Sequence, residues 1–516
     1  MPVLNHPETT PAEVRRPVVR RDAATILLGA AAGAAVSWLT ADGLIDDTYI
    51  TLAYARNLAE HGHWGMTPGM TSNAATSPLN VLLLAASTTV LRPVAGVAPV
   101  LALCLLTTLL AAFAAWCLGR AADRLGLPRT WPVVAVVAVL LNPFVISAVG
   151  LEVVLLATCM AALLAAGLAG RPVLYGLAAG AALLARLDMV VFVVVLALAC
   201  AGIRRRLPAA VAVCSAVALP WFAASWWWLG SAIPDTFVIK TLQHSFGEGR
   251  TYLRGLWTHY FPLMPVAVWV AVVPAAVGLL VLLVLLARLP GRRRPLPAGT
   301  GGLVGLGLAG VAYFTVYSRL GVPPYQWYYV PPMASLTVVA VLGTGVLLPR
   351  RRGGRVLRAW PVVVVPVVAG GLVAAVPAAA LPLPWAYPPV FGNFATPQQY
   401  RTIGLEVGER VGEQRVASPG EIGTLAYYCR CEIVDAFSDP TVLQPQIDQR
   451  IADADPVLKA LLEANYHRRD AGPVAAVPFT LQWIGAGATP PPGATAWETT
   501  AGTFQREDLL VLRESD

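Results

Sequence analysis

Charged residues are scarce in this chain. Asp, Glu, Lys and Arg make up 13% of its 516 residues, against about 25% in an ordinary soluble domain. Hydrophobic residues make up 57%, and the mean hydropathy is +0.64. This composition excludes a protein that is soluble as a whole. Lysine is nearly absent, with only Lys240 and Lys459, and the preference for arginine is typical of a GC-rich, actinobacterial type of source.

Features of several other protein classes are missing. No internal repeat is visible, which weakens an inverted-repeat transporter. The string Gly305–Gly310 matches a dinucleotide-binding pattern, but it lies in an apolar run without a preceding strand, so we expect no nucleotide cofactor. Small residues for helix packing explain it better. Cys429 and Cys431 are two apart: a mutual disulfide would be strained, and a zinc site lacks further ligands. We expect neither.

The formal net charge of +8 does not indicate nucleic-acid binding. The arginines stand in short clusters between apolar runs: Arg15-Arg16, Arg20-Arg21, Arg204–Arg206, Arg292–Arg294 and Arg350–Arg352. This is the positive-inside pattern of membrane proteins. We therefore expect a multi-pass protein of the plasma membrane, with the clusters in the cytoplasm and no nucleic-acid partner.

The apolar runs predict about 11 transmembrane helices, at 23–41, 97–118, 131–148, 153–169, 172–185, 189–203, 208–229, 265–289, 302–319, 331–348 and 361–381. The first is read as an uncleaved span, not as a signal peptide. Leu79–Leu91 is too short for a usual span. If it crossed, every later arginine cluster would lie on the wrong side, so we expect it to lie in the membrane interface or to re-enter, as a juxtamembrane helix.

Three regions follow from this topology. Residues 1–22 form a basic cytoplasmic N-terminus, and residues 23–381 form the transmembrane domain, whose main outer-face loops are 42–96 and 230–264. The tail, 382–516, is richer in acidic residues and contains no possible span. Its pattern predicts a small extracytoplasmic α/β domain, with strands and a short helix at Arg415–Ser418, Glu432–Ala436 and Glu421–Tyr428.

Ionisable residues gather where the spans reach the outer face. They include the acids Asp46, Asp47, Glu152 and Asp188, and the bases Arg56, Arg186, Lys240 and His244. Such groups are costly at a membrane boundary, which indicates function. The structural alternatives are helix caps for the acids, a surface ion pair between Arg186 and Asp188, and a snorkelling Lys240. His61 and His63 lack a nearby third metal ligand and are read as loop histidines.

Adjacent Asp46 and Asp47 stand at the start of a segment with helical spacing, Thr48–Glu60. Asp47 is the better-placed cap for that helix. Capping needs only one acid, and two neighbouring carboxylates repel each other unless a cation or substrate lies there. The pair is therefore a candidate catalytic site, and a candidate site for a divalent cation such as Mg²⁺, Mn²⁺ or Ca²⁺.

Several motifs together resemble the GT-C glycosyltransferases, especially the branch of mycobacterial terminal arabinofuranosyltransferase B. They are Asp46–Leu58, Pro68-Gly69, Ala75–Leu79, Gly150–Glu152, Ala185–Asp188, Ile233–Thr236 with Lys240, and Ile433–Pro440. The sequence departs from the pattern where Leu187 replaces a usual proline and where Gln326–Tyr328 replaces an Arg-Tyr motif. The resemblance covers most of the chain in consistent order.

The resemblance implies an α-helical polytopic membrane enzyme that transfers a sugar from a polyprenyl-phosphate donor to a cell-envelope glycan or lipoglycan on the outer face. Asp46 or Asp47 would be the general base or a cation ligand. Lys240, with Arg186 or His244, would neutralise the departing phosphate, beside Arg56, Glu152 and Asp188. Arabinofuranose is the first sugar expected and mannose the second. A lipid or glycan transporter is the alternative from another class.

Overall fold

The computed structural model describes residues 12–239, 246, 250–289, 296–348, 369–376, 380–381, 383–501 and 506–515. Within this part of the chain, seven helices are long and apolar enough to cross a membrane, and four shorter apolar helices accompany them. The long ones include α1 (Ala12–Thr40), α3 (Pro78–Ala95), α4 (Pro99–Leu125), α11 (Leu207–Trp228), α15 (Pro265–Arg288), α16 (Thr300–Leu320) and α17 (Val330–Leu347).

The shorter apolar helices are α5 (Thr130–Leu140), α7 (Val153–Leu168), α8 (Pro172–Ala185) and the pair η1 (Leu187–Met189) and α9 (Val190–Ala199). Ten of the eleven predicted spans thus coincide with helices. The eleventh, 361–381, lies mainly outside the described residues. Short connecting elements are α6 (Pro143–Ile146), α10 (Ala201–Arg204), α12 (Asp235–Ile239), α13 (Tyr252–Gly255), η2 (Leu256–Tyr260), α14 (Phe261–Leu263) and η3 (Gln326–Tyr329).

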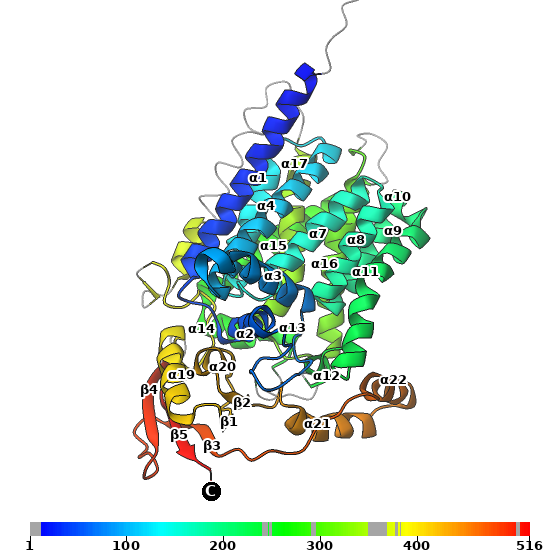
Figure 1. Cartoon of the computed structure of the whole chain (residues 1–516). Helices are drawn as coiled ribbons and strands as arrows, with labels where there is room; N and C mark the ends of the chain where they lie inside the picture. Colours follow the sequence, from blue (N-terminus) through cyan, green and yellow to red (C-terminus); the bar gives the residue numbers. More distant parts are fainter. Residues whose placement is uncertain are drawn as a thin grey trace, which may run out of the picture.

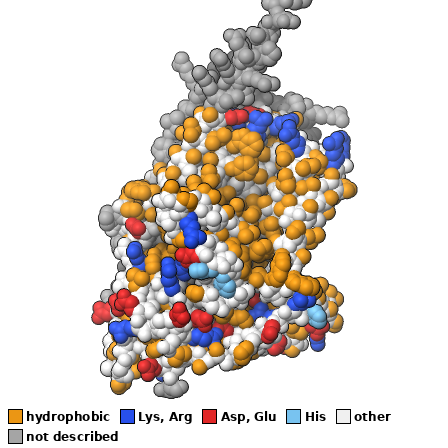
Figure 2. Space-filling model, viewed as in Figure 1, with side chains coloured by type: hydrophobic (Ala, Val, Ile, Leu, Met, Phe, Trp, Pro, Cys, Tyr) orange, Lys and Arg blue, Asp and Glu red, His pale blue; other side chains and the backbone are white. Residues whose placement is uncertain are grey.

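Burial differs sharply among these helices. In α17, 78% of the most apolar window is buried, whereas in α11 the share is 11%. A helix in lipid satisfies its backbone internally, so an apolar helix can expose most of its surface there. Hence α17 lies at the centre of the bundle and α11 at its edge. Figure 2 shows hydrophobic side chains over the middle of the visible face, with charged ones toward both ends.

The expected arginine-rich ends and the tail lie at opposite ends of the bundle. Figure 1 shows α10, which ends at Arg204, and the start of α1 far from the tail. At that distant end, Arg129 forms ion pairs with Asp22 and Asp123. The separation is the one that the positive-inside topology requires, and the extracytoplasmic side of the tail stays a prediction.

The first outer loop contains α2 (Asp46–His61) and α3. The structure makes α3 longer than the apolar run Leu79–Leu91. It packs against α2 and α4, and Figure 1 shows it near the end of the bundle that carries the tail. Its interfacial position stays a prediction, since its length and composition also suit a span.

The tail is the expected α/β domain. Its sheet has the strand order β2-β1-β3-β5-β4, from β1 (Arg415–Ala417), β2 (Glu432–Val434), β3 (Phe479–Gly485), β4 (Thr495–Ala501) and β5 (Arg506–Glu514). β1 pairs in parallel with β2 and β3, and the other pairs are antiparallel. The helices are α19 (Pro397–Val411), α20 (Gly423–Cys429), α21 (Pro440–Ala452) and α22 (Pro456–Tyr466). The expected strands and short helix are therefore present.

The tail does not form a separate hydrophobic core. Buried Ala53 and Tyr54 of α2 belong to the same apolar cluster as Tyr400 and Ile403 of α19 and Leu425 of α20. Removing this shared surface from water stabilises the contact between the tail and the first outer loop. The loop and the tail therefore form one layer over the end of the bundle.

Two local expectations were wrong. α2 begins at Asp46 with Ile45 as its N-cap and without a side-chain cap hydrogen bond, so Asp47 is not the cap. Cys429 and Cys431 are joined in a disulfide, although their spacing argued against it. They lie at the end of α20, where Arg430 adopts a left-handed conformation (φ 56°) that turns the chain back on itself.

Candidate active site

A tight turn presents Glu152 to the interior. Gly150 in this turn has φ +98°, and a Cβ there would lie 2.2 Å from Cγ2 of Thr48, so only glycine fits without strain. The Thr48 hydroxyl donates to the Val149 carbonyl at 3.0 Å, and the Asn80 amide donates to the Gly150 carbonyl at 3.0 Å. Helices α2 and α3 thus hold the turn that precedes α7.

Glu152, Arg186 and Asp188, which the sequence places at the same ends of the spans, meet in one buried cluster. The Arg186 guanidinium donates to Oε1 of Glu152 at 3.0 Å and through Nε to Oδ2 of Asp188 at 3.0 Å. It also donates to the Tyr317 hydroxyl at 2.8 Å. The Tyr313 hydroxyl donates to Asp188 at 2.9 Å, and the Tyr317 hydroxyl donates to the same carboxylate.

This cluster is not a simple phosphate site. Two carboxylates face one guanidinium, so its donors are directed at acids that already compensate its charge. Charge-assisted hydrogen bonds of this kind are strong and directional, and removing one partner from a buried set leaves an uncompensated charge. Arg186 therefore mainly holds Glu152 and Asp188 in place. A direct contact between Arg186 and a donor phosphate stays a prediction.

A row of packed tyrosine rings extends from this cluster. Tyr252 stacks on Tyr329 with centroids 4.4 Å apart, and it lies 5.4 Å from Tyr317. Tyr260 meets Tyr329 edge to face at 6.3 Å. Tyr328 packs under the Arg186 guanidinium, 4.8 Å from ring centroid to Cζ. Such rings combine apolar faces with hydroxyl groups, which suits the alternating CH and OH surface of a sugar.

Asp47 is half-buried in the first turn of α2, directly after Asp46. Burial raises the pKa of the Tyr260 hydroxyl, and smaller contributions come from neighbouring tyrosines and from Asp47. The charge of Asp47 therefore acts on one tyrosine of the row, and its role as a catalytic base stays a prediction.

Asp46 has a different place. Its carboxylate is buried and accepts the backbone N–H groups of Ile422 and Gly423 at 2.9 Å and of Thr424 at 2.7 Å. It thus binds the N-terminus of α20 in the tail, where an acid is favourable. Burial raises the pKa of Asp46, although these three N–H groups oppose the shift. The structure joins the outer loop and the tail through this residue.

Arg56 is not part of the cluster. The Arg56 guanidinium donates to the Tyr427 carbonyl at 2.6 Å and lies over the Tyr427 ring, 4.6 Å from its centroid. It therefore supports the contact between α2 and α20. Lys240 and His244 lie outside the described residues.

A divalent cation does not fit the pair Asp46-Asp47 well. Both oxygens of Asp46 already accept backbone hydrogen bonds, whereas Mg²⁺ and Ca²⁺ need several oxygen ligands. In the part of the chain that the structure describes, no group of three or more His, Cys, Asp or Glu side chains could hold a metal ion. We derive no step through a cation, and its presence stays a prediction.

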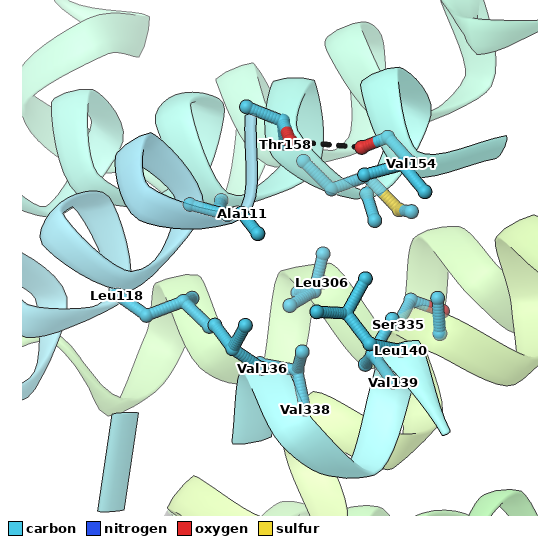
Figure 3. Close-up of a pocket in the computed structure, with 15 residues that line it drawn as sticks. Ala111, Leu118, Val136, Val139, Leu140, Val154, Thr158, Leu306, Ser335 and Val338 are labelled. Atoms are coloured by element: carbon cyan, nitrogen blue, oxygen red, sulfur yellow. Dashed lines mark hydrogen bonds between the residues drawn. The ribbon is translucent and has the colours of Figure 1, made fainter. Parts of the chain in front are cut away.

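An apolar cavity lies deeper in the bundle. Figure 3 shows it between helices α4, α5, α7, α16 and α17, with Thr158 as one of its few polar neighbours. Its volume is about 30 Å³, whereas a cavity that is known to hold a molecule as small as benzene measures about 150 Å³. It cannot hold a prenyl chain and is not a candidate donor site.

These observations define a multi-pass membrane protein with a polar, tyrosine-lined centre beneath an extramembrane tail. Its fold is similar to that of ArnT from Cupriavidus metallidurans bound to undecaprenyl phosphate, with a TM-score of 0.51, 14% sequence identity and coverage of 96% of this chain and 97% of that chain. It is also similar to ArnT from Cupriavidus metallidurans in the apo state, with the same TM-score and identity over 94% and 97%. No protein-family model and no curated protein matches the sequence.

The similarity confirms the expected GT-C-like fold. At 14% identity it concerns the fold alone. The neighbours are ArnT structures, so the branch of terminal arabinofuranosyltransferase B stays a prediction.

Sequence reasoning missed most of the tyrosines. A signal was available, because Tyr325, Trp327, Tyr328 and Tyr329 stand within five residues just before α17. Tyr313 and Tyr317 are four apart on one face of α16, which is the spacing of neighbours on a helix. The apolar pattern places Tyr313 and Tyr317 within a predicted span, and Gln326–Tyr328 stand out only as a departure from an Arg-Tyr motif.

Proposed function

We propose that this chain is a membrane glycosyltransferase that transfers a sugar from a polyprenyl-phosphate donor to a cell-envelope glycan or lipoglycan on the outer face. The observation that carries the proposal is the similarity in fold over nearly the whole length of both chains to ArnT bound to undecaprenyl phosphate. A fold alone does not assign a function. The site residues supply the second support.

The reaction needs a group that removes the acceptor proton. In our proposal, Asp47 takes the proton of the acceptor hydroxyl as that oxygen bonds to the anomeric carbon. The bond from the anomeric carbon to the phosphate oxygen breaks, and polyprenyl phosphate leaves with the electron pair. Asp46 is less suited to this role, because its oxygens accept the N–H groups of α20. The sequence alone slightly favours Asp46 as the catalytic acid, because Asp47 is the better-placed helix cap, and our proposal reverses that preference.

The tyrosine row and the cluster around Arg186 shape the sugar site in this proposal. The rings of Tyr252 and Tyr329 offer flat surfaces, and Glu152 and Asp188 offer acceptors to sugar hydroxyls. The Glu152–Arg186–Asp188 hydrogen bonds fix these acceptors in advance, which lowers the cost of ordering them when substrate binds. Lys240 and His244 remain the proposed partners of the departing phosphate.

The sugar is arabinofuranose in our first proposal and mannose in the second, as the sequence resemblance implies. The test uses purified protein in lipid nanodiscs with polyprenyl-phosphate arabinofuranose or polyprenyl-phosphate mannose and an envelope glycan acceptor. We expect one lipid-linked sugar to be transferred, with release of polyprenyl phosphate. Transport of an intact lipid-linked sugar between leaflets without such release would refute the enzyme and support the transporter.

A further inference from the structure

Helix α22 in the tail has three faces of different character. Leu458, Leu462 and Tyr466 turn inward, and Leu462 and Tyr466 are buried. Lys459, Glu463 and His467 form an exposed polar face. Val457, Ala460, Leu461 and Ala464 form a third face, which is apolar and exposed. At 3.6 residues per turn, each set lies on its own side of the helix.

The apolar face is unusually exposed for such residues. Val457 is 72% exposed and Leu461 is 64% exposed. The neighbouring polar face is the side of the helix that is suited to water. A helix of an ordinary soluble domain has one apolar face against the core and a polar remainder. The second apolar face of α22 therefore needs a second apolar environment.

The same face continues into the end of span α11. The Trp226 indole N–H donates to the Ala464 carbonyl at 2.9 Å, and Arg468, one turn further on, lies 3.8 Å from the Trp227 ring centroid. Trp227 and Trp228 are 58% and 75% exposed. Tryptophan is enriched where a span leaves the hydrocarbon. Figure 1 shows α22 at the edge of the molecule, next to this end of α11.

The inward face fixes the direction of the apolar one. Leu462 and Tyr466 pack with Val238 and Ile239 of α12 and with α21. The Asn465 side chain accepts the backbone N–H groups of Ala232 and Ile233, both at 3.0 Å. Arg469 forms a buried ion pair with Asp235. Because α22 is held on its inner side, it cannot rotate to bury Val457 and Leu461 within this chain.

We propose that α22 is an interfacial helix, whose apolar face of Val457, Ala460, Leu461 and Ala464 lies in the outer leaflet of the bilayer beside α11. Its partner is the boundary between lipid headgroups and acyl chains, where amphipathic helices bind. Arg468 extends from this face to the headgroups, stacked on Trp227, as a long basic side chain does at an interface. The polar face with Lys459 and Glu463 turns to water.

The test uses the full chain in nanodiscs of equal parts phosphatidylcholine and phosphatidylglycerol. An environment-sensitive fluorescent amino acid replaces Leu461, or Glu463 in the matched control on the water face. Discs with and without brominated acyl chains are then compared, since bromine quenches only a probe that touches lipid. Replacing Val457 provides a second probe on the apolar face, in case the change at Leu461 disturbs folding.

We expect brominated lipid to lower the emission at positions 461 and 457 by about twofold or more, as for a side chain at the acyl boundary, with little change at 463. Equal responses at 461 and 463 would overturn the proposal. So would a probe at 461 and 457 that reports an apolar environment but is not quenched by lipid. In that case a second copy of the chain or another protein covers the face.

Discussion

Replacing Asp46 with alanine tests the role of this residue as the link between the outer loop and the tail. The change removes the acceptor of three buried N–H groups at the start of α20. Asp42, an exposed acid four residues earlier, provides the matched control. Asp46→Asn is the conservative variant, since it keeps one oxygen acceptor.

The expected cost follows from these contacts. A buried donor without a partner costs about 1–3 kcal/mol, and an acid beside a helix N-terminus contributes about 0.3–1 kcal/mol. Burial of the carboxylate is itself unfavourable, as the raised pKa of Asp46 indicates, and this offsets part of the loss. We expect docking of α20 to weaken by about 2 kcal/mol, which corresponds to about a thirtyfold change in its opening equilibrium.

Hydrogen exchange measures this opening directly at the amides of Ile422, Gly423 and Thr424. In Asp46→Ala these amides should exchange about thirtyfold faster than in the wild type. The increase should be smaller in Asp46→Asn, and Asp42→Ala should exchange at the wild-type rate. Unchanged protection of all three amides in a folded Asp46→Ala protein would refute the proposed link.

Three further predictions concern stability and topology. Burial, and next the charge of Asp46, raises the pKa of Glu421 from 4.5 to about 8. The stability that protonated Glu421 contributes is therefore complete below pH 4.5 and is lost as the pH rises through about 8. The unfolding temperature of the Glu421→Gln variant should lack this pH dependence. Gly150→Ala should lower the unfolding temperature and transfer activity, because φ +98° and the Thr48 contact both oppose a Cβ. Gly170→Ala is the control, because Gly170 has φ +63° but the nearest atom to an added Cβ lies 3.6 Å away. It should lower the unfolding temperature less than Gly150→Ala does. Equal effects would argue against the contact with Thr48. Ala486 is exposed in the tail, so an impermeant thiol reagent should label the cysteine of Ala486→Cys in intact cells. Labelling only after the membrane is opened would place the tail in the cytoplasm.

The sequence predicted what local pattern and solvation control. Charged groups are costly at a membrane boundary, so Glu152, Arg186 and Asp188, dispersed along the chain, were expected at one end of the bundle, where the structure pairs them. The strand and helix pattern around α20 was also local, because residue spacing reports which face is buried.

The role of Asp46 could not be predicted in this way. Its partners are backbone N–H groups of Ile422, Gly423 and Thr424, which carry no side-chain signature and lie more than 370 residues away along the chain. The Cys429–Cys431 disulfide was missed for a related reason. Spacing alone did not reveal the left-handed Arg430 that turns the chain between the two cysteines.

The most direct test of the central claim is the rate of sugar transfer from a polyprenyl-phosphate donor by purified, reconstituted Asp47→Asn protein, compared with wild type and Asp46→Asn. Loss of a general base lowers the rate by about 10²–10⁴, so Asp47→Asn should be folded, normally inserted and nearly inactive. Asp46→Asn should retain measurable transfer. Near-normal transfer by Asp47→Asn would contradict the account, because Asp47 would then have no part in the reaction.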